Sequence, residues 1–265
     1  RGFAQSQRWR RPSIMNMGGG KPSAEQAATV LDPARGKDLH TGSVPTVASS
    51  GTLTGVWAEE NTRASLYDAF RRKEVFATSG TRLQLRFFGG WAFDQQMITA
   101  EDGVARAYEV GATMVEDLPT RPADASAPSF AVWALKDPDS GNLDRAQIIK
   151  VWLEDGQHRE KVYDVAWSGD RQPDSATGKL PAVGNTVDLK TGAYTNAIGA
   201  TALNTVWTDP DFNPAQPAVY YLRVLEIPTP RWSTLLAIAN DLAIADNAPA
   251  TLQERGWSSP HPGER

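Results

Sequence analysis

The sequence of 265 residues predicts an α+β fold in which a mostly antiparallel, β-sandwich-like domain makes up most of the chain. Three observations lead to this prediction. Apolar and polar residues alternate in several segments between about residues 81 and 228, which is the period of a half-buried strand. Loops rich in Gly, Pro and Asp separate these segments, as they do in antiparallel sandwiches. Helical patterns lie only before and after this region, so helices and strands are segregated along the chain.

The first 52 residues have little periodic apolar pattern and are rich in Gly, Pro, Ser and Arg. Such a composition is typical of loops, so residues 1–52 are expected to be irregular or extended. The chain begins with Arg1 rather than methionine, and we expect it to be processed, truncated or a fragment of a longer protein.

A helix is predicted over about residues 63–73. Thr62 is a suitable N-cap, because its hydroxyl can accept a hydrogen bond from the first turn. Leu66 and Phe70 are four residues apart, with Tyr67 beside them, so the three are expected to share one face. Cationic residues at the end of the segment would interact favourably with the negative, C-terminal end of the helix dipole.

Five segments with strand periodicity follow this helix. In the first, Leu83, Leu85 and Phe87 alternate with polar residues. Asp155-Gly156, between the third and the fourth, predicts a β-hairpin. The fifth is apolar on both faces, as expected of a central strand. The predicted strands cover residues 81–88, 129–135, 146–153, 159–166 and 218–227.

The C-terminal part of the chain predicts one more helix and a loose end. "RWSTLLAIANDLAIA" (231–245) has the composition of a helix, and "SSPHPGER" (258–265) that of an unstructured terminus.

Composition excludes several classes of protein. The net charge of −4 argues against nucleic-acid binding, which needs a basic face. Without cysteine, the chain has no disulfide, zinc–thiolate site or cysteine nucleophile. No apolar run reaches the roughly 18 residues of a membrane span. These features suit a periplasmic and a cytoplasmic protein equally well, so the compartment stays open.

Histidines and acidic turns give only weak signals for a metal site. His40, His158 and His261 are expected to lie in surface loops, and none of them forms a closely spaced pair. In "DPDFNP", Asp209 and Asp211 have the spacing of a calcium loop, but Pro214 replaces its glycine. We therefore predict a proline-ordered turn there, and another turn at "DPDSGN" (137–142).

The nine tryptophans are many for this length. They are expected to fill the core of the sandwich, while a platform for sugars or aromatic ligands stays an alternative.

The segment "WAEENTRASLYDAFRRKEVFATSG" (57–80) contains the best candidates for a site. Glu59 and Glu60 precede the helix, where carboxylates are stabilised by the dipole whether or not they have a function. Arg63 could bind an anionic group. Thr78 and Ser79 offer hydroxyls beside a glycine, which suits an anion site and a tight turn alike.

Three blocks of the sequence carry a family resemblance. They are residues 55–91, 148–166 and 206–232, and "QERGWSSP" (253–260) adds to them. Together they resemble the bacterial family known as domain of unknown function 3604, which is related to the polymerase and histidinol phosphatase (PHP) metallohydrolases.

The resemblance implies a division into three parts. Residues 1–52 would be an irregular segment, 53–92 the last helix, loop and strand of a PHP-like α/β barrel, and 93–265 a β-rich C-terminal domain. The intact protein would bind a divalent metal (Mn, Zn or Fe) that activates a water molecule. The principal metal-ligand motifs of the superfamily are not found in this chain, so Glu59, Glu60, Arg63, Thr78 and Ser79 would act as supporting residues.

Two functions are therefore expected. In the first, the chain is the C-terminal part of a PHP-like metal-dependent hydrolase, with a phosphoester as the expected substrate class and the small molecule itself unknown. In the second, it is a non-catalytic β-sandwich that binds a ligand or assembles subunits, through contact with a missing N-terminal half or with a second copy.

Overall fold

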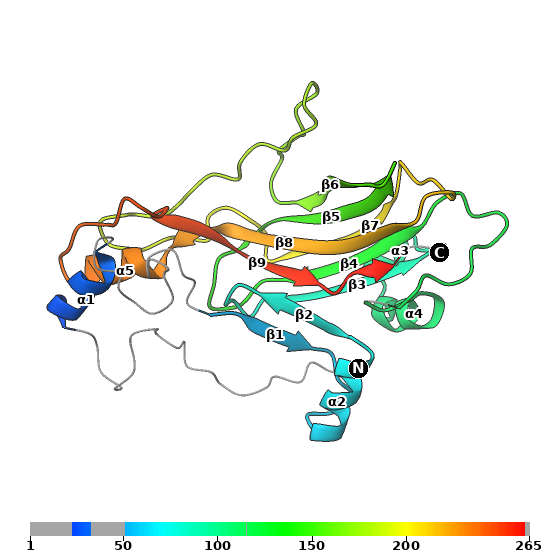
Figure 1. The fold of residues 1–265 in the computed structure, drawn as a ribbon, viewed down its shortest axis with the longest axis horizontal. Coiled ribbons are helices and arrows are strands. Elements are labelled where there is room, and N and C mark those ends of the chain that lie inside the picture. Colours follow the sequence, from blue (N-terminus) through cyan, green and yellow to red (C-terminus); the bar gives the residue numbers. More distant parts are fainter. Residues whose placement is uncertain (1–22, 33–50, 115, 263–265) are drawn as a thin grey trace.

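The structure, a computed structural model, describes residues 23–32, 51–114 and 116–262. Two antiparallel sheets lie face to face, and short helices flank them (Figure 1). The predicted α+β class and the mostly antiparallel, sandwich-like arrangement are confirmed. No helix in these residues is long and apolar enough to cross a membrane.

The larger sheet has seven strands in the order β1-β2-β9-β8-β5-β6, and β10 also pairs with β8. Because β8 has neighbours on both sides, the prediction that its segment is a central strand is confirmed. These strands are β1 (Leu53–Val56), β2 (Val75–Thr78), β5 (Leu143–Glu154), β6 (Gln157–Trp167), β8 (Ala218–Pro230), β9 (Thr251–Ser258) and β10 (His261–Pro262).

The smaller sheet has three strands, β3 (Gln84–Gly90), β4 (Ser129–Leu135) and β7 (Ala202–Thr208), with β4 in the middle. The core lies between its inner face and that of the larger sheet. Phe130 on β4 contacts Phe87 on β3 and Tyr220 on β8, with ring centroids 5.4 and 4.6 Å apart. The alternating pattern therefore predicted the core-facing side of β3 correctly.

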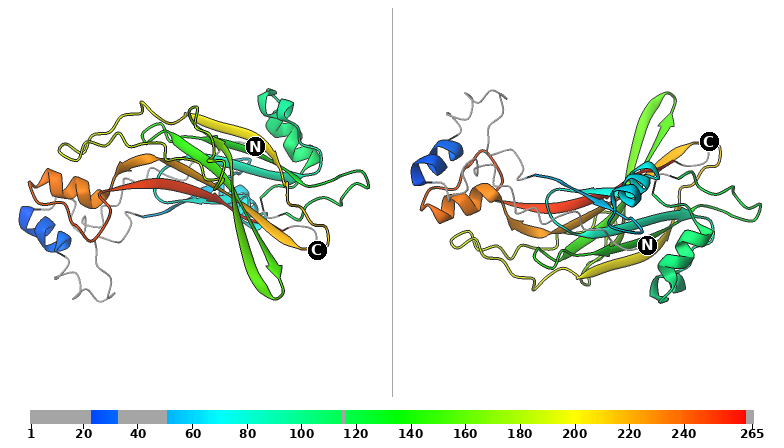
Figure 2. Two further views of the ribbon diagram at one scale, coloured as in Figure 1. Left: turned by 90° about the horizontal axis from the view of Figure 1, so that it is seen from above. Right: turned by 90° about the horizontal axis from the view of Figure 1, so that it is seen from below.

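The outer face of the smaller sheet is covered by α3 (Gln95–Thr99) and α4 (Gly103–Val110), as both views of Figure 2 show. Phe88 packs there with Met97 and Ala107 in a second cluster. For this reason β3 is buried on both faces, whereas its sequence predicted a half-buried strand.

Helix α2 (Arg63–Arg71) begins after Thr62, whose hydroxyl accepts a hydrogen bond from the Ser65 backbone N–H. The predicted N-cap is thus confirmed, while the three residues expected to share one face differ in burial, because Leu66 packs against a small core cluster. Tyr67 and Phe70 are 61% and 50% exposed, while Ala69 is the residue that the helix buries.

Two described segments near the ends of the chain, residues 23–32 and 258–262, are more regular than the sequence predicted. Residues 24–31 form α1 (Ala24–Leu31), which Ser23 and Gln26 cap reciprocally, so residues 1–52 are not irregular throughout. The expected late helix is α5 (Trp232–Ala239), and α1 contacts it. The loose end expected from residue 258 is wrong as far as residue 262, since His261 is fully buried and β10 pairs with β8.

Residues 53–92 contribute to both sheets. Strand β2 pairs with β9, which lies near the other end of the chain, and β3 belongs to the smaller sheet. In these described residues, no helix or strand forms a barrel-like unit separate from the sandwich.

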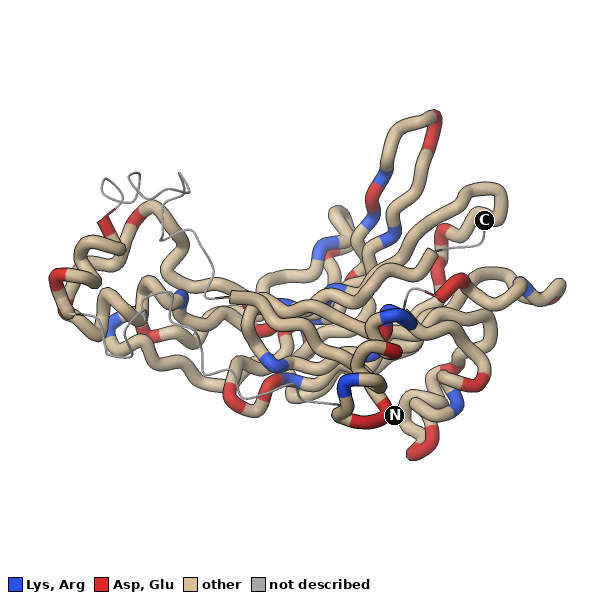
Figure 3. The backbone as a smooth tube through the Cα atoms, turned by 60° about the horizontal axis from the view of Figure 1, so that its bottom comes forward, with Lys and Arg blue, Asp and Glu red and all other residues tan. Residues whose placement is uncertain are grey.

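The predicted hairpin between β5 and β6 is confirmed, with positive φ at Asp155 (52°) and Gly156 (74°). Figure 2 shows this hairpin projecting from the body of the sandwich. Acidic and basic residues follow one another along it (Figure 3), including Arg159, Glu160 and Lys161 on the edge strand β6. Such charges disfavour pairing of an edge strand with another chain.

Candidate functional site

The structure separates the five predicted site residues into two groups. The β1–β2 ladder pairs Val56 with Val75 at one end and Leu53 with Thr78 at the other. The Val56–Val75 end is followed by the exposed residues Glu59, Glu60 and Arg63. Thr78 and Ser79 lie at the opposite end, so the five residues form no common site.

Thr78 and Ser79 stabilise the turn between β2 and β3. The buried Thr78 hydroxyl donates a hydrogen bond to the Thr81 carbonyl oxygen at 2.5 Å. The Ser79 hydroxyl donates to the Glu254 carboxylate, and its oxygen accepts from the Arg255 backbone N–H at 2.8 Å. Both hydroxyls therefore stabilise the turn, and the turn borders a group of buried polar side chains.

This group is centred on Glu226, which β8 places on its inward face together with Leu222 and Val224. Its carboxyl group is completely buried and accepts hydrogen bonds from the Thr81 hydroxyl (2.6 Å) and the Ser140 hydroxyl. The same Thr81 hydroxyl lies 3.4 Å from Oδ2 of the buried Asp137. We call Glu226, Thr81, Ser140 and Asp137 the Glu226 cluster.

Backbone groups hold Asp137 in place within this cluster. The N–H groups of Arg82 and Asp139 donate to its carboxylate at 2.7 and 2.9 Å. Ser140 N–H bonds to the Asp137 carbonyl oxygen, so the turn predicted at residues 137–142 is confirmed. No pattern in the sequence indicated that this turn would face a buried glutamate.

The protonation of Glu226 is set mainly by its burial. Burial raises its pKa to about 7, the hydroxyls of Ser140 and Thr81 oppose this, and the carboxylates of Asp137 and Glu254 add to it. Among the described residues no Lys or Arg pairs with the Glu226 carboxyl group. Near neutral pH this group can therefore both release and take up a proton, as a general acid or base must.

A second buried polar group, the Lys150 cluster, lies toward the other end of β8. Lys150 Nζ is 2.6 Å from Asp209 Oδ2, and the two side chains are 4% and 0% exposed. The Tyr220 hydroxyl donates to the same oxygen at 2.7 Å, and burial raises the pKa of Tyr220. Lysine, aspartate and tyrosine thus form a fully bonded ionic group inside the core.

A similar but solvent-exposed group lies beside it. Asp211 accepts from Lys161 Nζ and from the Tyr163 hydroxyl (2.6 Å), and the Lys161 hydrogen bond is the main cause that lowers its pKa. Asp211 N–H in turn donates to Asp209 Oδ1 at 2.9 Å. The turn predicted here is confirmed, and the ammonium groups of two lysines face its carboxylates.

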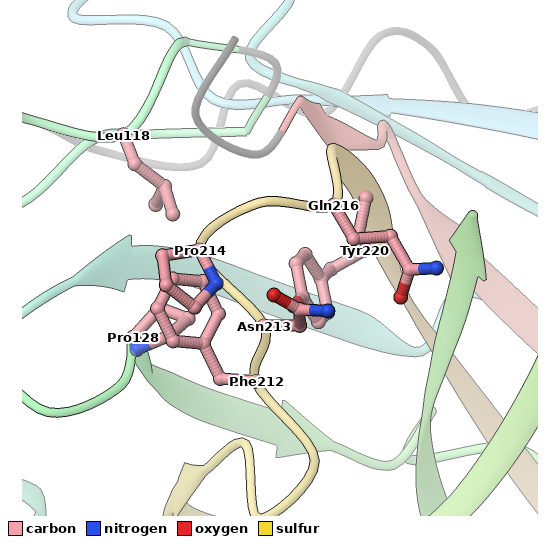
Figure 4. A pocket seen from close by; sticks show the side chains of 8 residues that line it. Leu118, Pro128, Phe212, Asn213, Pro214, Gln216 and Tyr220 are labelled. Atoms are coloured by element: carbon pink, nitrogen blue, oxygen red, sulfur yellow. The ribbon is translucent and has the colours of Figure 1, made fainter. Parts of the chain in front are cut away.

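The hollow next to this turn is small (Figure 4). It has room for about one water molecule, so it does not suit a metabolite. Its lining is Leu118, Pro128, Phe212, Asn213, Pro214, Gln216, Ala218 and Tyr220.

The two histidines in the described part of the chain, His158 and His261, do not form a metal site together. His158 is exposed on β6, and His40 lies outside the described residues. His261, expected in a surface loop, is instead fully buried beside Phe87, with its ring nitrogens 3.2 and 3.3 Å from the carbonyl oxygens of Glu116 and Phe87. This burial lowers the pKa of His261.

The described residues do not fit the metal that the family resemblance implies. Within residues 23–32, 51–114 and 116–262, no group of three or more His, Cys, Asp or Glu side chains is arranged to hold a metal ion. We therefore derive no chemical step through a metal in this part of the chain.

Tryptophans contribute to the core, as the first of the two interpretations predicted. Trp57 is 6% exposed, its indole N–H donates to the Leu85 carbonyl oxygen, and the Arg86 guanidinium lies 3.5 Å above its ring. Others are partly buried and pack against the two core clusters, namely Trp91, Trp133, Trp152 and Trp207.

Fold and site together define an antiparallel β-sandwich protein with a buried, titratable carboxyl group at one end of its core. The chain matches the family model described as protein of unknown function (DUF3604) over residues 16–261, and it belongs to that family. Neither a curated protein nor a solved structure matches it. The resemblance to this family is thus confirmed, while the relationship to PHP metallohydrolases stays a prediction.

Proposed function

We propose that this chain is the C-terminal, β-sandwich part of a PHP-like metal-dependent hydrolase, with a phosphoester as the expected substrate class. The family match over residues 16–261 supports the proposal, because it includes all three blocks on which the resemblance to this family rests, and the PHP relationship is what that resemblance implies. In this proposal the principal metal ligands belong to a preceding part of the intact protein. The sandwich supplies supporting groups, of which Glu226 is suited to proton transfer and Arg63 to contact with an anion.

The intact protein, expressed from the complete gene, provides the direct test. We expect about one or more equivalents of Mn, Zn or Fe by elemental analysis, and hydrolysis of p-nitrophenyl phosphate that a chelator abolishes. Intact protein that contains no such metal, and whose gene encodes no Asp-x-His-x-His segment upstream of Arg1, would rule the proposal out.

Arg63→Ala in the intact protein tests whether α2 contributes to the site. Arg63 is exposed at the first position of α2, so its removal should leave the melting temperature nearly unchanged. If it contacts an anionic substrate, kcat/KM should fall roughly 10- to 100-fold. Arg71→Ala, an exposed arginine at the other end of the same helix, is the matched control. Equal activity of the two variants would assign Arg63 no role.

One observation favours the alternative function, a non-catalytic assembly module. Tyr67 and Phe70 expose large rings on the same helix, and neighbouring exposed aromatic side chains mark contact surfaces in many proteins. Light scattering of the double variant Tyr67→Ser/Phe70→Ser tests it. Loss of a wild-type oligomer would support the alternative, and an unchanged mass would argue against self-assembly through this surface.

A further inference from the structure

We propose that the Glu226 cluster is a proton-operated latch, which holds the β2–β3 turn and the β4–β5 loop against β8 and releases both when its proton is lost. This inference concerns the sandwich alone and does not depend on the proposed hydrolase function.

The latch follows from the position of one hydroxyl group. Thr81 has a single hydroxyl hydrogen, yet its oxygen lies 2.6 Å from Glu226 Oε1 and 3.4 Å from Asp137 Oδ2. When Glu226 carries a proton, it donates to the Thr81 oxygen, and the Thr81 hydrogen is free to bond to Asp137. Ser140 donates to the other oxygen of Glu226. Every group in the cluster then has a partner.

Loss of the proton removes this arrangement. The Thr81 hydrogen turns to the nearer acceptor, Glu226, and Asp137 loses it. Two carboxylates are then ionised in a buried site, at 0% and 6% exposure, which is unfavourable without a compensating cation. Three segments meet here and are expected to separate first. They are the β2–β3 turn with Thr81, the β4–β5 loop with Asp137 and Ser140, and β8 with Glu226.

Among the described residues, the charged groups around the cluster do not offset this repulsion. On β9, Glu254 adds a further negative charge, and the Arg255 guanidinium donates to the Gln253 carbonyl oxygen. On the β2–β3 turn, the exposed Arg82 lies nearest Asp139, at 3.9 Å. On the β4–β5 loop, Lys136 Nζ donates to the Pro138 carbonyl oxygen.

The buried carboxylate Asp144 also lies near β8, because Gln253 donates both to it and to the Glu226 backbone carbonyl oxygen. Asp144 forms its ion pairs with Arg145 and Arg171. These two cations are therefore engaged with another carboxylate.

The direction of the pH dependence follows from the pKa of Glu226. Its pKa is raised from 4.5 to about 7 in the folded protein, so the stabilisation is complete below about pH 4.5 and is lost as the pH rises through 7. From pH 5.5 to pH 8, this single group should increase the unfolding equilibrium constant roughly 30-fold.

Hydrogen exchange measured by mass spectrometry at pH 5.5 and pH 8, corrected for the intrinsic rate, tests the latch. Between pH 5.5 and pH 8, the peptides that contain residues 79–83 and 137–142 should lose protection. Their loss should be roughly tenfold greater than that of the peptide with residues 209–216, which the Lys150 cluster holds in place. Glu226→Gln keeps the hydrogen-bonding shape without titrating and should remove the difference. Glu160→Gln, on the exposed hairpin, should retain it.

Two results would overturn the proposal. One is that, in the wild-type protein, the peptides with residues 79–83 and 137–142 lose no more protection between pH 5.5 and pH 8 than the peptide with residues 209–216. The other is a pH dependence that persists in Glu226→Gln. Should that variant fail to fold, infrared difference spectra of the wild-type protein decide the question. A buried, protonated carboxyl band that disappears near pH 7 supports the latch, and its absence at pH 5.5 refutes it.

Discussion

Strand β8 places polar side chains at two points of its inward face, and the two sites neutralise buried carboxylates in different ways. Beside Tyr220 the buried carboxylate is that of Asp209, and the Lys150 ammonium, 2.6 Å from it, neutralises its charge. At Glu226 the described partners are hydroxyls, and the pKa rises until a proton neutralises the group. The comparison teaches that one core can hold a permanent ion pair and a titratable acid, depending only on whether a cation reaches the site.

The largest expected effect comes from removing the cation of the permanent pair. Lys150→Met leaves Asp209 buried without its cation, which should lower the free energy of unfolding by about 3–5 kcal/mol at pH 7. Urea denaturation measures this loss. Lys161→Met is the control, because its ammonium and the carboxylate of its partner Asp211 lie in side chains that are 51% and 48% exposed. The control should lose less than about 1 kcal/mol. Similar losses in both variants would contradict the contrast between the sites.

A smaller effect is expected from removing one hydroxyl of the Lys150 cluster. Tyr220→Phe deletes the donor that reaches Asp209 at 2.7 Å, and the cost should be about 1.5–3 kcal/mol because the acceptor is charged and buried. Tyr163→Phe makes the equivalent change at the exposed Asp211 and should cost less than about 1 kcal/mol. If the order of the two costs were reversed, burial would not be the deciding factor.

The smallest effect of the three is expected at the Glu226 cluster when it is protonated. At pH 5.5 Thr81→Val removes a hydroxyl whose main partner is then neutral, so the loss should be about 1–2 kcal/mol, seen as a lower melting temperature. Thr205→Val on β7 is the control, since its hydroxyl reaches only the neighbouring Val206 carbonyl oxygen at 3.3 Å. A Thr81→Val loss as large as that of Lys150→Met would indicate that Glu226 is charged even at this pH.

The sequence predicted the parts of the fold that depend on local periodicity. All five predicted strands are present, because long segments such as residues 146–153 alternate or remain apolar over many positions. The short strands β1 and β2 and the polar strand β9 have no such pattern, and only long-range pairing makes them strands. Helix α1 did have a local signal, the Ser23–Gln26 capping box, within a segment of loop-like composition.

Only the edge of the candidate site was predictable. Thr78 and Ser79 stood out as hydroxyls beside a glycine, and they do border the Glu226 cluster. Glu226 itself had a usable signal, because it follows Leu222 and Val224 at every second position and therefore faces the core. Its partners Thr81 and Asp137 come from turns whose meeting depends on tertiary structure, and no pattern in the sequence reports that meeting.

Strand β9 completes the larger sheet by pairing with β2 on one side and β8 on the other. Ser79 and Arg255, which are hydrogen-bonded across this junction, are 176 residues apart in the sequence. During synthesis on the ribosome, the β1–β2 pair must therefore wait for β9 until almost all of the sandwich has been made. Because such distant contacts slow folding, the growing chain exposes an incomplete sheet for a long time, and this interval is when it most needs protection by chaperones.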